Sequence, residues 1–274
     1  MKVLLTGHSG FIGQSLLKLL LKKKTNLYVT KHNKLLIPKK SNISVIDLKK
    51  KNTQLISFDI VIHAAWSKLD NYNSLDHSKK IFPENYKFLS KLINLGLKNL
   101  VVLGTCFEIG NCNGEVNEKI KMKPITKYGF AKKKLLLKLM SLQKKKNFTL
   151  TWARIFYLYG ENQRKKSLFK QIENHNKKKN KVVFKMTSGN QTRDYINVDS
   201  LSKKIIRIAF LKKNIGIVNV CSGTPVSIKK LVLQWKNRYK WDIKFNFGSK
   251  TQKKYEPYNF WGSTKKLKNV LNRS

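Results

Sequence analysis

A chain of 274 residues with 41% hydrophobic residues is long enough to bury one full domain core and a smaller appendage, which indicates a globular protein. The formal net charge of +44 comes from lysines spread over the whole length, with arginine at only six positions, and this bias argues against nucleic acid as a partner. Three cysteines without a CxxC pair exclude a disulfide scaffold and a metal site, and no apolar run approaches the roughly 18 residues of a membrane span, so we expect a cytoplasmic protein without a membrane partner.

The first half of the chain alternates short apolar runs with helical patterns, which is typical of a parallel sheet with crossover helices. The expected strands are Lys2–Leu5, Leu27–Thr30, Ser44–Ile46, Ile60–His63, Leu100–Leu103 and Thr149–Arg154. The expected helices are Gln14–Leu21, Phe88–Leu95 and Tyr128–Met140, where leucine and isoleucine recur at helical spacing.

Beyond about residue 155 this regular alternation loosens. Short strand-like pieces at Val182–Lys185 and Val218–Val220 indicate a smaller mixed domain. We therefore predict an α/β fold, a Rossmann-type doubly wound parallel sheet with a smaller mixed α/β C-terminal substrate domain. Residues 1–155 would form the dinucleotide-binding domain, and residues 156–274 mainly the substrate-binding portion, with later segments able to return to the first domain.

A glycine-rich loop joins the first strand to the first helix. Its sequence, TGHSGFIG at residues 6–13, contains Gly7, Gly10 and Gly13. These glycines let the backbone turn tightly and approach a pyrophosphate, which is then held by amides at the helix start, where Phe11 and Ile12 lie. The loop therefore predicts a bound dinucleotide.

The residues after the second strand indicate which dinucleotide is bound. An acidic residue there would accept hydrogen bonds from the adenosine ribose and select NAD. This chain has Lys31 and Lys34 instead, with no acid between them. Because lysines would attract a 2′-phosphate, the sequence favours NADP(H) over NAD(H).

A tyrosine and a lysine form the candidate catalytic pair. Tyr128 and Lys132 are four residues apart at the start of a predicted helix, so both lie on one helix face. A neighbouring ammonium favours the phenolate and lowers the pKa of a tyrosine, which suits Tyr128 to general acid/base catalysis on a sugar hydroxyl or carbonyl. Thr105 follows an earlier strand, and its hydroxyl could hydrogen-bond the same reacting oxygen.

Taken together, these motifs are similar to those of an extended short-chain dehydrogenase/reductase of the sugar-nucleotide epimerase/dehydratase kind. The resemblance runs nearly end to end. It is carried by the glycine loop, Asp59–Ala65, Gly104–Gly110, Tyr128 with Lys132, Arg154 with Tyr159 and Gly160, Arg193–Asp199, and Trp261–Lys265.

The resemblance implies roles for further residues. Tyr128 would be the acid/base, and Lys132 would also hold the nicotinamide ribose. Arg193 would clamp the substrate diphosphate, and Tyr157 stands where some relatives have an asparagine near the substrate. The remaining cofactor contacts would come from Asp47 and Leu48 at the adenine, from Ala64 and Ala65 along the cofactor, and from Asn85.

One departure from the family excludes a reaction. The 4,6-dehydratases of the family follow the threonine with an Asp-Glu pair that eliminates water, but this chain has Cys106 and Phe107 there. Glu108 comes one residue later, and we expect it to point elsewhere. Dehydration is therefore not expected.

Two enzymatic outcomes and one non-catalytic alternative stay open. The favoured function is reduction of a 4-keto-6-deoxy sugar nucleotide by hydride transfer at C4. A redox-neutral 4-epimerase of a nucleotide sugar would use the same chemistry. A non-catalytic protein that binds a dinucleotide or RNA is the rival, although such a protein has no need of Thr105, Tyr128 and Lys132 together. The partner would be a nucleotide-sugar substrate, and dimers through paired long helices, common in the family, leave a homodimer open.

Overall fold

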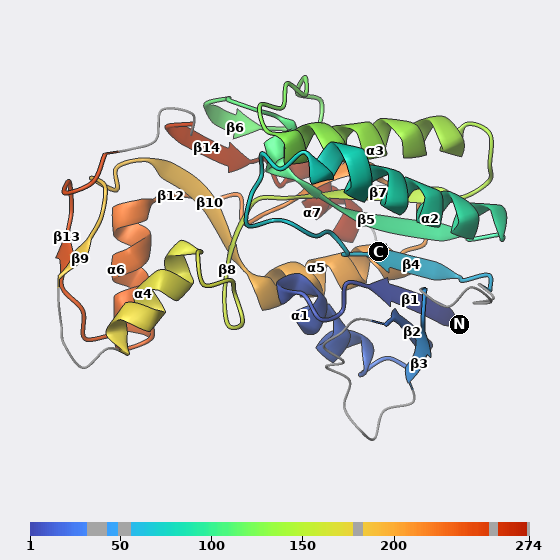
Figure 1. Cartoon of the computed structure of the whole chain (residues 1–274), viewed down its shortest axis with the longest axis horizontal. Helices are drawn as coiled ribbons and strands as arrows, with labels where there is room; N and C mark the ends of the chain where they lie inside the picture. The colour runs from blue at the N-terminus through green and yellow to red at the C-terminus, as the bar shows by residue number, and fades with distance from the viewer. Residues whose placement is uncertain (32–42, 49–55, 178–182, 252–256, 273–274) are drawn as a thin grey trace.

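A seven-stranded parallel sheet forms the centre of the larger part of the molecule (Figure 1). The computed structural model describes residues 1–31, 43–48, 56–177, 183–251 and 257–272. The strand order is β11-β7-β5-β4-β1-β2-β3, so the order reverses between β1 and β4, where doubly wound sheets bind their ligands. The strands are β1 (Lys2–Thr6), β2 (Asn26–Thr30), β3 (Ile43–Ile46), β4 (Ile60–His63), β5 (Asn99–Thr105), β7 (Thr149–Ile155) and β11 (Gly216–Val220).

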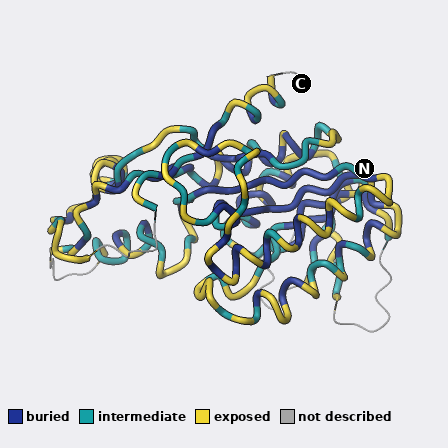
Figure 2. The backbone as a smooth tube through the Cα atoms, turned by 90° about the horizontal axis from the view of Figure 1, so that it is seen from above, coloured by how far each residue is buried: buried dark blue, intermediate teal, exposed yellow. Residues whose placement is uncertain are grey.

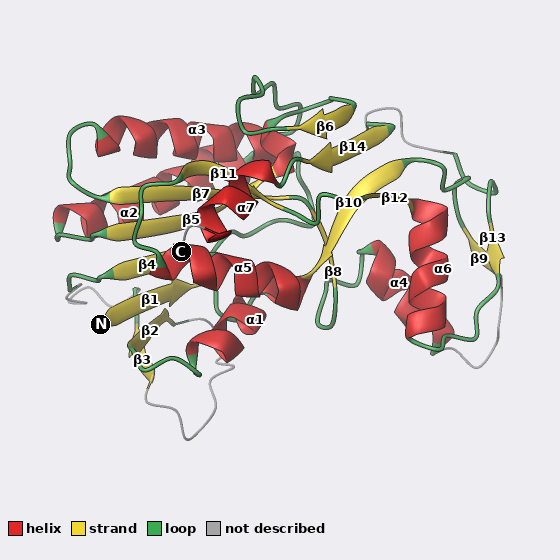
Figure 3. Cartoon of the chain, turned by 180° about the vertical axis from the view of Figure 1, so that it is seen from behind, coloured by secondary structure: helices red, strands yellow, loops and turns green. Residues whose placement is uncertain are grey.

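Helices cover both faces of this sheet. On one face α1 (Phe11–Leu20), α5 (Val198–Phe210) and α7 (Lys265–Asn272) share a core with the strands, and Figure 3 shows α5 and α7 on that side. On the other face α2 (Phe82–Asn94) and α3 (Lys127–Gln143) enclose a second core. Because both faces are covered, the central strands are buried on both sides, and Figure 2 shows them as a dark band between partly exposed helices. Among the described helices, none is long and apolar enough to cross a membrane.

A second sheet and a small helical lobe complete the molecule. The sheet has the order β12-β10-β14-β6, and β8 pairs with β10. Next to it, aromatic and aliphatic side chains of α4 and α6 form a separate core, on the side of the molecule away from the N-terminus (Figure 1). The elements are β6 (Gly114–Val116), β8 (Tyr157–Tyr159), α4 (Leu168–Asn176), β9 (Phe184–Lys185), β10 (Thr192–Asn197), β12 (Pro225–Ser227), α6 (Ile228–Arg238), β13 (Phe245–Asn246) and β14 (Asn259–Gly262).

The predicted Rossmann-type fold is confirmed, with one strand in a different place. Val218–Val220 was expected in the smaller domain, but it lies in β11 and pairs in parallel with β7 at the edge of the large sheet. A short apolar run has the same sequence pattern in either sheet, so the pattern does not predict which strand it pairs with. Of the other expected piece, Phe184 and Lys185 form β9, whereas Val182 lies outside the described residues.

Candidate functional site

The glycine loop packs tightly against the end of β4. Gly7 has a φ of +71°, and a Cβ there would lie 2.7 Å from the amide nitrogen of Ala65. A Cβ on Gly13 would lie 1.9 Å from the carbonyl oxygen of Gly7, so neither position accepts a side chain. Helix α1 begins at Phe11, and neither a side-chain cap at Gly10 nor an acid in the first turn occupies its start. Its first amides therefore point to an anion, and the loop fits the pyrophosphate of a dinucleotide.

A hydrogen-bonded group at the ends of β1 and β4 lies beside this loop. Thr6 Oγ1 is 2.9 Å from Nδ1 of His63 and accepts a hydrogen bond from the amide of Ala65. Asn85 of α2 donates to the carbonyl oxygen of Ile81 at 2.6 Å, and its side chain acts on the pKa of His63. Burial and the nearby Lys132 lower the pKa of His63 to about 3, so the ring is neutral. The arrangement brings Ala65 and Asn85 to the point where the strand order reverses.

The candidate adenine contacts lie after strands β2 and β3. Nζ of Lys31 is 2.8 Å from Oδ2 of Asp47, so its charge is paired with a carboxylate. Leu48 is exposed beside Asp47. Lys34, the second lysine of the sequence argument, lies outside the described residues.

Thr105, Tyr128 and Lys132 come together at the carboxyl end of β5. Thr105 ends that strand, and Tyr128 and Lys132 lie in the first turns of α3, which starts after the capping hydroxyl of Thr126. The Thr105 side chain lies beside the phenol of Tyr128 and acts to lower its pKa. Nζ of Lys132 donates to the carbonyl oxygen of Leu103 at 2.6 Å. The three predicted catalytic residues thus form one buried group.

The segment after β4 covers Tyr128 with aromatic rings. The ring of Tyr72 stacks on Tyr128 with centroids 5.3 Å apart, and the amide of Tyr128 donates to the Tyr72 carbonyl. Trp66 and His77 approach the same phenol ring, with centroids 5.9 and 5.4 Å from it. Trp66 also donates to Nδ1 of His77, while Nε2 of that ring contacts the carbonyl of Asn71. These aromatic contacts of Tyr128 were not predicted from the sequence, although Trp66 directly follows Ala65.

The ionisation of the catalytic pair differs from the sequence expectation. Burial raises the pKa of Tyr128 above its ordinary value, and nearby Tyr72 adds to the rise, whereas the Thr105 side chain opposes it. Burial lowers the pKa of Lys132 to about 7. Among the described groups, Lys132 is not one that acts on the Tyr128 pKa, so the expected lowering is not seen; its ammonium lies 4.1 Å over the Trp66 ring and donates to the Leu103 carbonyl.

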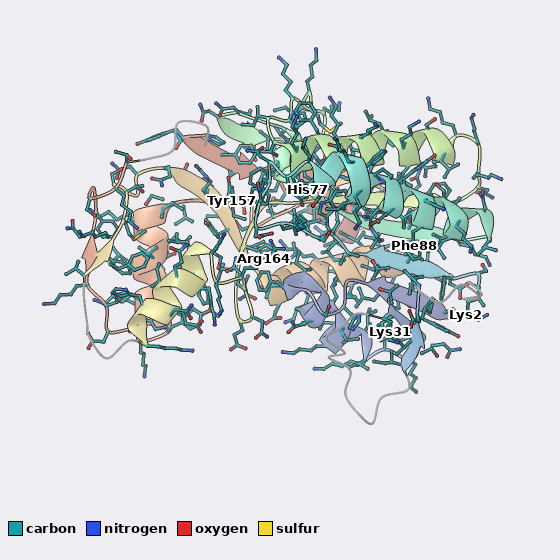
Figure 4. All side chains as sticks on the ribbon, viewed as in Figure 1. Lys2, Lys31, His77, Phe88, Tyr157 and Arg164 are labelled. Carbon is teal, nitrogen blue, oxygen red and sulfur yellow. The ribbon has the colours of Figure 1, made fainter. Side chains whose placement is uncertain are left out.

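The predicted substrate residues lie between the large sheet and the smaller lobe. Arg193 is buried, and its Nη1 donates to the main-chain carbonyls of Thr192 and Tyr258 at 2.8 and 3.1 Å. Its guanidinium lies 5.5 Å from the centre of the Tyr157 ring. Arg164, which the sequence argument did not select, acts electrostatically on Tyr72, and Figure 4 shows it with Tyr157 at the junction of the two parts. Among the described residues no cluster of three or more histidine, cysteine or acidic side chains suits a metal ion.

The sequence matches a known protein family. Residues 3–221 match the model of the NAD dependent epimerase/dehydratase family. The chain is 26% identical over 276 residues to a dTDP-6-deoxy-L-talose 4-dehydrogenase (NAD(+)) of Aggregatibacter actinomycetemcomitans, covering 96% of this chain and 100% of the relative. It is 25% identical to an uncharacterized UDP-glucose epimerase, YtcB, of Bacillus subtilis, covering 99% and 92% of the two chains.

A solved structure shares the fold over the full length. The UDP-glucuronic acid 4-epimerase from Bacillus cereus, in complex with UDP-glucuronic acid and NAD, has a TM-score of 0.79 at 22% identity. The match covers 100% of this chain and 94% of that one.

These findings correct the expected cofactor. The preference for NADP(H) is wrong: the Aggregatibacter relative is named as an NAD(+) enzyme, and the Bacillus cereus structure holds NAD. The structure gives a physical reason, because Asp47 already neutralises the lysine on which the preference was based. A charge that is paired at 2.8 Å attracts a 2′-phosphate much less than the sequence alone suggests.

The predicted family and the predicted enzyme are confirmed, and the non-catalytic alternative is set aside. The family match spans the glycine loop, the Thr105 strand and the Tyr128 helix, which are the parts that build the site. The chain belongs to the NAD dependent epimerase/dehydratase family and is an enzyme of that family.

Proposed function

We propose that this enzyme transfers a hydride at C4 of a nucleotide-linked hexose, and that its net reaction is the reduction of a 4-keto-6-deoxy sugar nucleotide. The observation that carries the proposal is the buried group at the end of β5 in which Thr105 lies beside the phenol of Tyr128, with Lys132 one helical turn away. A hydroxyl, a phenol and an ammonium at one strand end are the groups that bind and protonate a carbonyl oxygen.

The cofactor proposed for the site is NAD. The residues that would hold it are those of the glycine loop, Lys31 with Asp47 and Leu48 at the adenine end, Ala64, Ala65 and Asn85 along the sheet edge, and Lys132 at the nicotinamide ribose. When bound, NAD(H) supplies the hydride that the reduction needs. The tight packing of Gly7 and Gly13, which leaves the helix amides uncovered by side chains, supports this assignment.

Tyr128 would donate its phenolic proton to O4 of the keto sugar as C4 becomes tetrahedral. Since burial raises the pKa of Tyr128, the phenol carries its proton at neutral pH, as this direction of reaction requires. Thr105 would orient O4 by a hydrogen bond from its hydroxyl, while Lys132 would hold the nicotinamide ribose beside it. Reversal of the same steps oxidises a C4 alcohol.

The substrate assignment is supported by the Aggregatibacter relative. Its name describes oxidation at C4 of a 6-deoxy sugar carried by dTDP, which is the reverse of the proposed reduction. For the diphosphate we propose Arg193, because a guanidinium matches two phosphate oxygens at once, with Tyr157 against it.

A 4-epimerase is the second candidate, and the Bacillus subtilis relative, which is named as an uncharacterized UDP-glucose epimerase, favours it. The two reactions share the same proton transfer and differ in net redox change. With a panel of UDP-, dTDP-, GDP- and CDP-sugars, including 4-keto forms, a reductase consumes one reduced nicotinamide for each sugar. An epimerase leaves the absorbance of the reduced nicotinamide unchanged while the sugar inverts.

The substitution Tyr128→Phe tests the proposal. It removes the proton donor but keeps the ring and its stacking on Tyr72, so turnover should fall roughly 10²- to 10⁴-fold. The affinity for NAD, measured by the quenching of protein fluorescence, should stay within about twofold of the parent value.

The matched control is Tyr239→Phe, which removes a phenolic hydroxyl at the end of α6, in the smaller lobe. It should leave turnover unchanged. Full activity of Tyr128→Phe on the substrate that the parent enzyme turns over would remove Tyr128 from the mechanism.

A further inference from the structure

A buried carboxylate outside the predicted site lies directly behind it. Glu108 ends the 3₁₀ turn Cys106–Glu108 that follows β5, and its side chain has no exposed surface. Its Oε1 accepts a hydrogen bond from the amide of Thr105 at 2.8 Å. Both carboxylate oxygens lie 3.0 Å from Nε1 of Trp152, and Oε2 lies 3.5 Å from Nε of Arg154. All these partners are donors, so the ionised carboxylate is the form that suits them.

Glu108 fixes the backbone of Thr105. Thr105 caps the short turn: its hydroxyl accepts from the amide of Phe107 at 3.3 Å, while Glu108 reaches back to the amide of Thr105. This reciprocal capping box holds Thr105 in an extended conformation at φ −150° and ψ 147°. The direction of the hydroxyl that lies beside Tyr128 therefore depends on the carboxylate.

The approach of the Trp152 indole to this carboxylate depends on the neighbouring glycine. A Cβ on Gly104 would lie 2.1 Å from Nε1 of Trp152, so only glycine at position 104 leaves room for the indole. The Trp152 ring also lies near helix α3, since Nζ of Lys132 is 5.9 Å from the centre of the ring. Trp152 thus contacts both the carboxylate and the ammonium.

An ionised Glu108 offsets part of the positive charge buried behind the site. Lys132 and Arg154 are buried cations, and Glu108 acts electrostatically on both. Burial raises the pKa of Glu108, but Arg154 and the bonds from Thr105 and Trp152 oppose the rise. Burial lowers the pKa of Lys132 to about 7, and the charge of Glu108 opposes that fall. A buried ammonium without this carboxylate would lose its proton more readily still.

We propose that Glu108 is a positioning residue of the redox site, which fixes the Thr105 hydroxyl through its backbone and supplies negative charge that stabilises the Lys132 ammonium. The inference rests on the proposed function for its catalytic meaning, but its electrostatic part concerns the protein alone. The titratable groups that face Lys132 are Glu108 from the 3₁₀ turn, neutral His63 from β4, and Tyr128 on its own helix. Arg154 of β7 and Cys106 face Glu108.

The first test titrates Lys132 in the protein without substrate. Isotopically labelled lysine gives an NMR signal for each side chain, and the signal that titrates near pH 7 and vanishes in Lys132→Met belongs to Lys132. In Glu108→Gln, which keeps the shape and removes the charge, this midpoint should move down by about one pH unit or more. An unmoved midpoint in a folded Glu108→Gln protein would overturn the proposal.

The matched control is Glu84→Gln, the same substitution at an exposed site in the first turn of α2, which should leave the Lys132 midpoint in place. If Glu108→Gln does not fold, Glu108→Asp serves instead. It keeps the charge but withdraws the carboxylate from the Thr105 amide, so the midpoint should stay near the parent value while kcat falls roughly tenfold or more. A parent-like kcat in Glu108→Asp would overturn the positioning role.

Turnover separates this inference from the proposed function. If the parent enzyme acts on no sugar nucleotide while the Lys132 midpoint still moves in Glu108→Gln, the proposed function fails and the electrostatic role of Glu108 stands. If the parent is active, the pH at which kcat falls on the alkaline side, where Lys132 loses its proton, should shift downward in Glu108→Gln. A loss of kcat without this shift would mark Glu108 as a merely structural residue.

Discussion

At the scale of single residues, the pair of Lys31 and Asp47 explains why the cofactor prediction was wrong. Lys31 is half exposed, whereas Asp47 is largely buried, and their charged atoms are 2.8 Å apart. The pair forms because β2 and β3 run side by side in register, with Thr30 opposite Ile46. From the sequence, Asp47 was expected at the adenine and Lys31 at a phosphate. The contact between their side chains depends on the pairing of β2 with β3, which the sequence alone does not show.

The substitution Asp47→Ala should unmask this lysine. Without its carboxylate, Lys31 can attract a 2′-phosphate, so the affinity for NADP relative to NAD should rise roughly two- to fivefold, the size expected for a partly exposed ion pair. Fluorescence titration with both cofactors measures the ratio. Adding Lys31→Ala should cancel the gain. A ratio that stays the same or falls in Asp47→Ala would contradict the role given to the pair.

The catalytic residues were the part of the site most accessible to sequence reasoning. Tyr128 and Lys132 share a helix, so their spacing alone places them on one face, and Thr105 follows a strand with a clear apolar pattern. The ring of Tyr72 and the carboxylate of Glu108 were not found as neighbours of the site. Their contacts with Tyr128 and Thr105 depend on the path of loops and turns, for which the sequence carries no periodic pattern.

At the scale of elements, the connection from β1 to α1 is the most constrained part of the cofactor site. Gly13 lies in the first turn of α1 and packs on the carbonyl of Gly7. Gly10 has an ordinary φ of −77°, and a Cβ there would meet the same carbonyl only at 3.3 Å. The two glycines share a loop but differ in the space around them.

The substitutions Gly13→Ala and Gly10→Ala should therefore differ in stability. Gly13→Ala must push the loop apart and should cost about 3 kcal/mol, or roughly 5–10 °C in Tm. Gly10→Ala should cost less than about 1 kcal/mol, since only a small shift is needed. Thermal unfolding followed by circular dichroism gives both values. Equal losses would show that packing at Gly13 does not limit the loop.

The elements themselves were predicted well where apolar runs were long. The strand Ile60–His63 has the same bounds in the structure, and its four residues are buried as a continuous apolar run predicts. The prediction failed for Val218–Val220, whose partner β7 lies more than 60 residues earlier in the chain. Pairing over such a separation depends on the path of the helices between the strands, which local patterns do not encode.

At the scale of the whole molecule, the site combines both parts of the chain. The glycine loop and Thr105 follow strands of the large sheet, and α3 supplies Tyr128 and Lys132, while β8 and β10 of the second sheet carry Tyr157 and Arg193, the proposed substrate residues. The net charge of +44 gives the molecule a positive field, which would draw in an anionic cofactor and the proposed sugar-nucleotide substrate. The high positive charge is therefore compatible with the proposed function, and a nucleic-acid partner is not required to explain it.

Isotope transfer tests the central claim, hydride transfer at C4, most directly. The enzyme is incubated with NAD and a panel of sugar nucleotides that carry deuterium at C4 of the hexose, and the label is followed by mass spectrometry. We expect the deuterium to leave C4 of one sugar and appear in the reduced nicotinamide, and we expect Tyr128→Phe to suppress this transfer. Retention of the label at C4 in every sugar of the panel, with the configuration at C4 unchanged, would contradict the account.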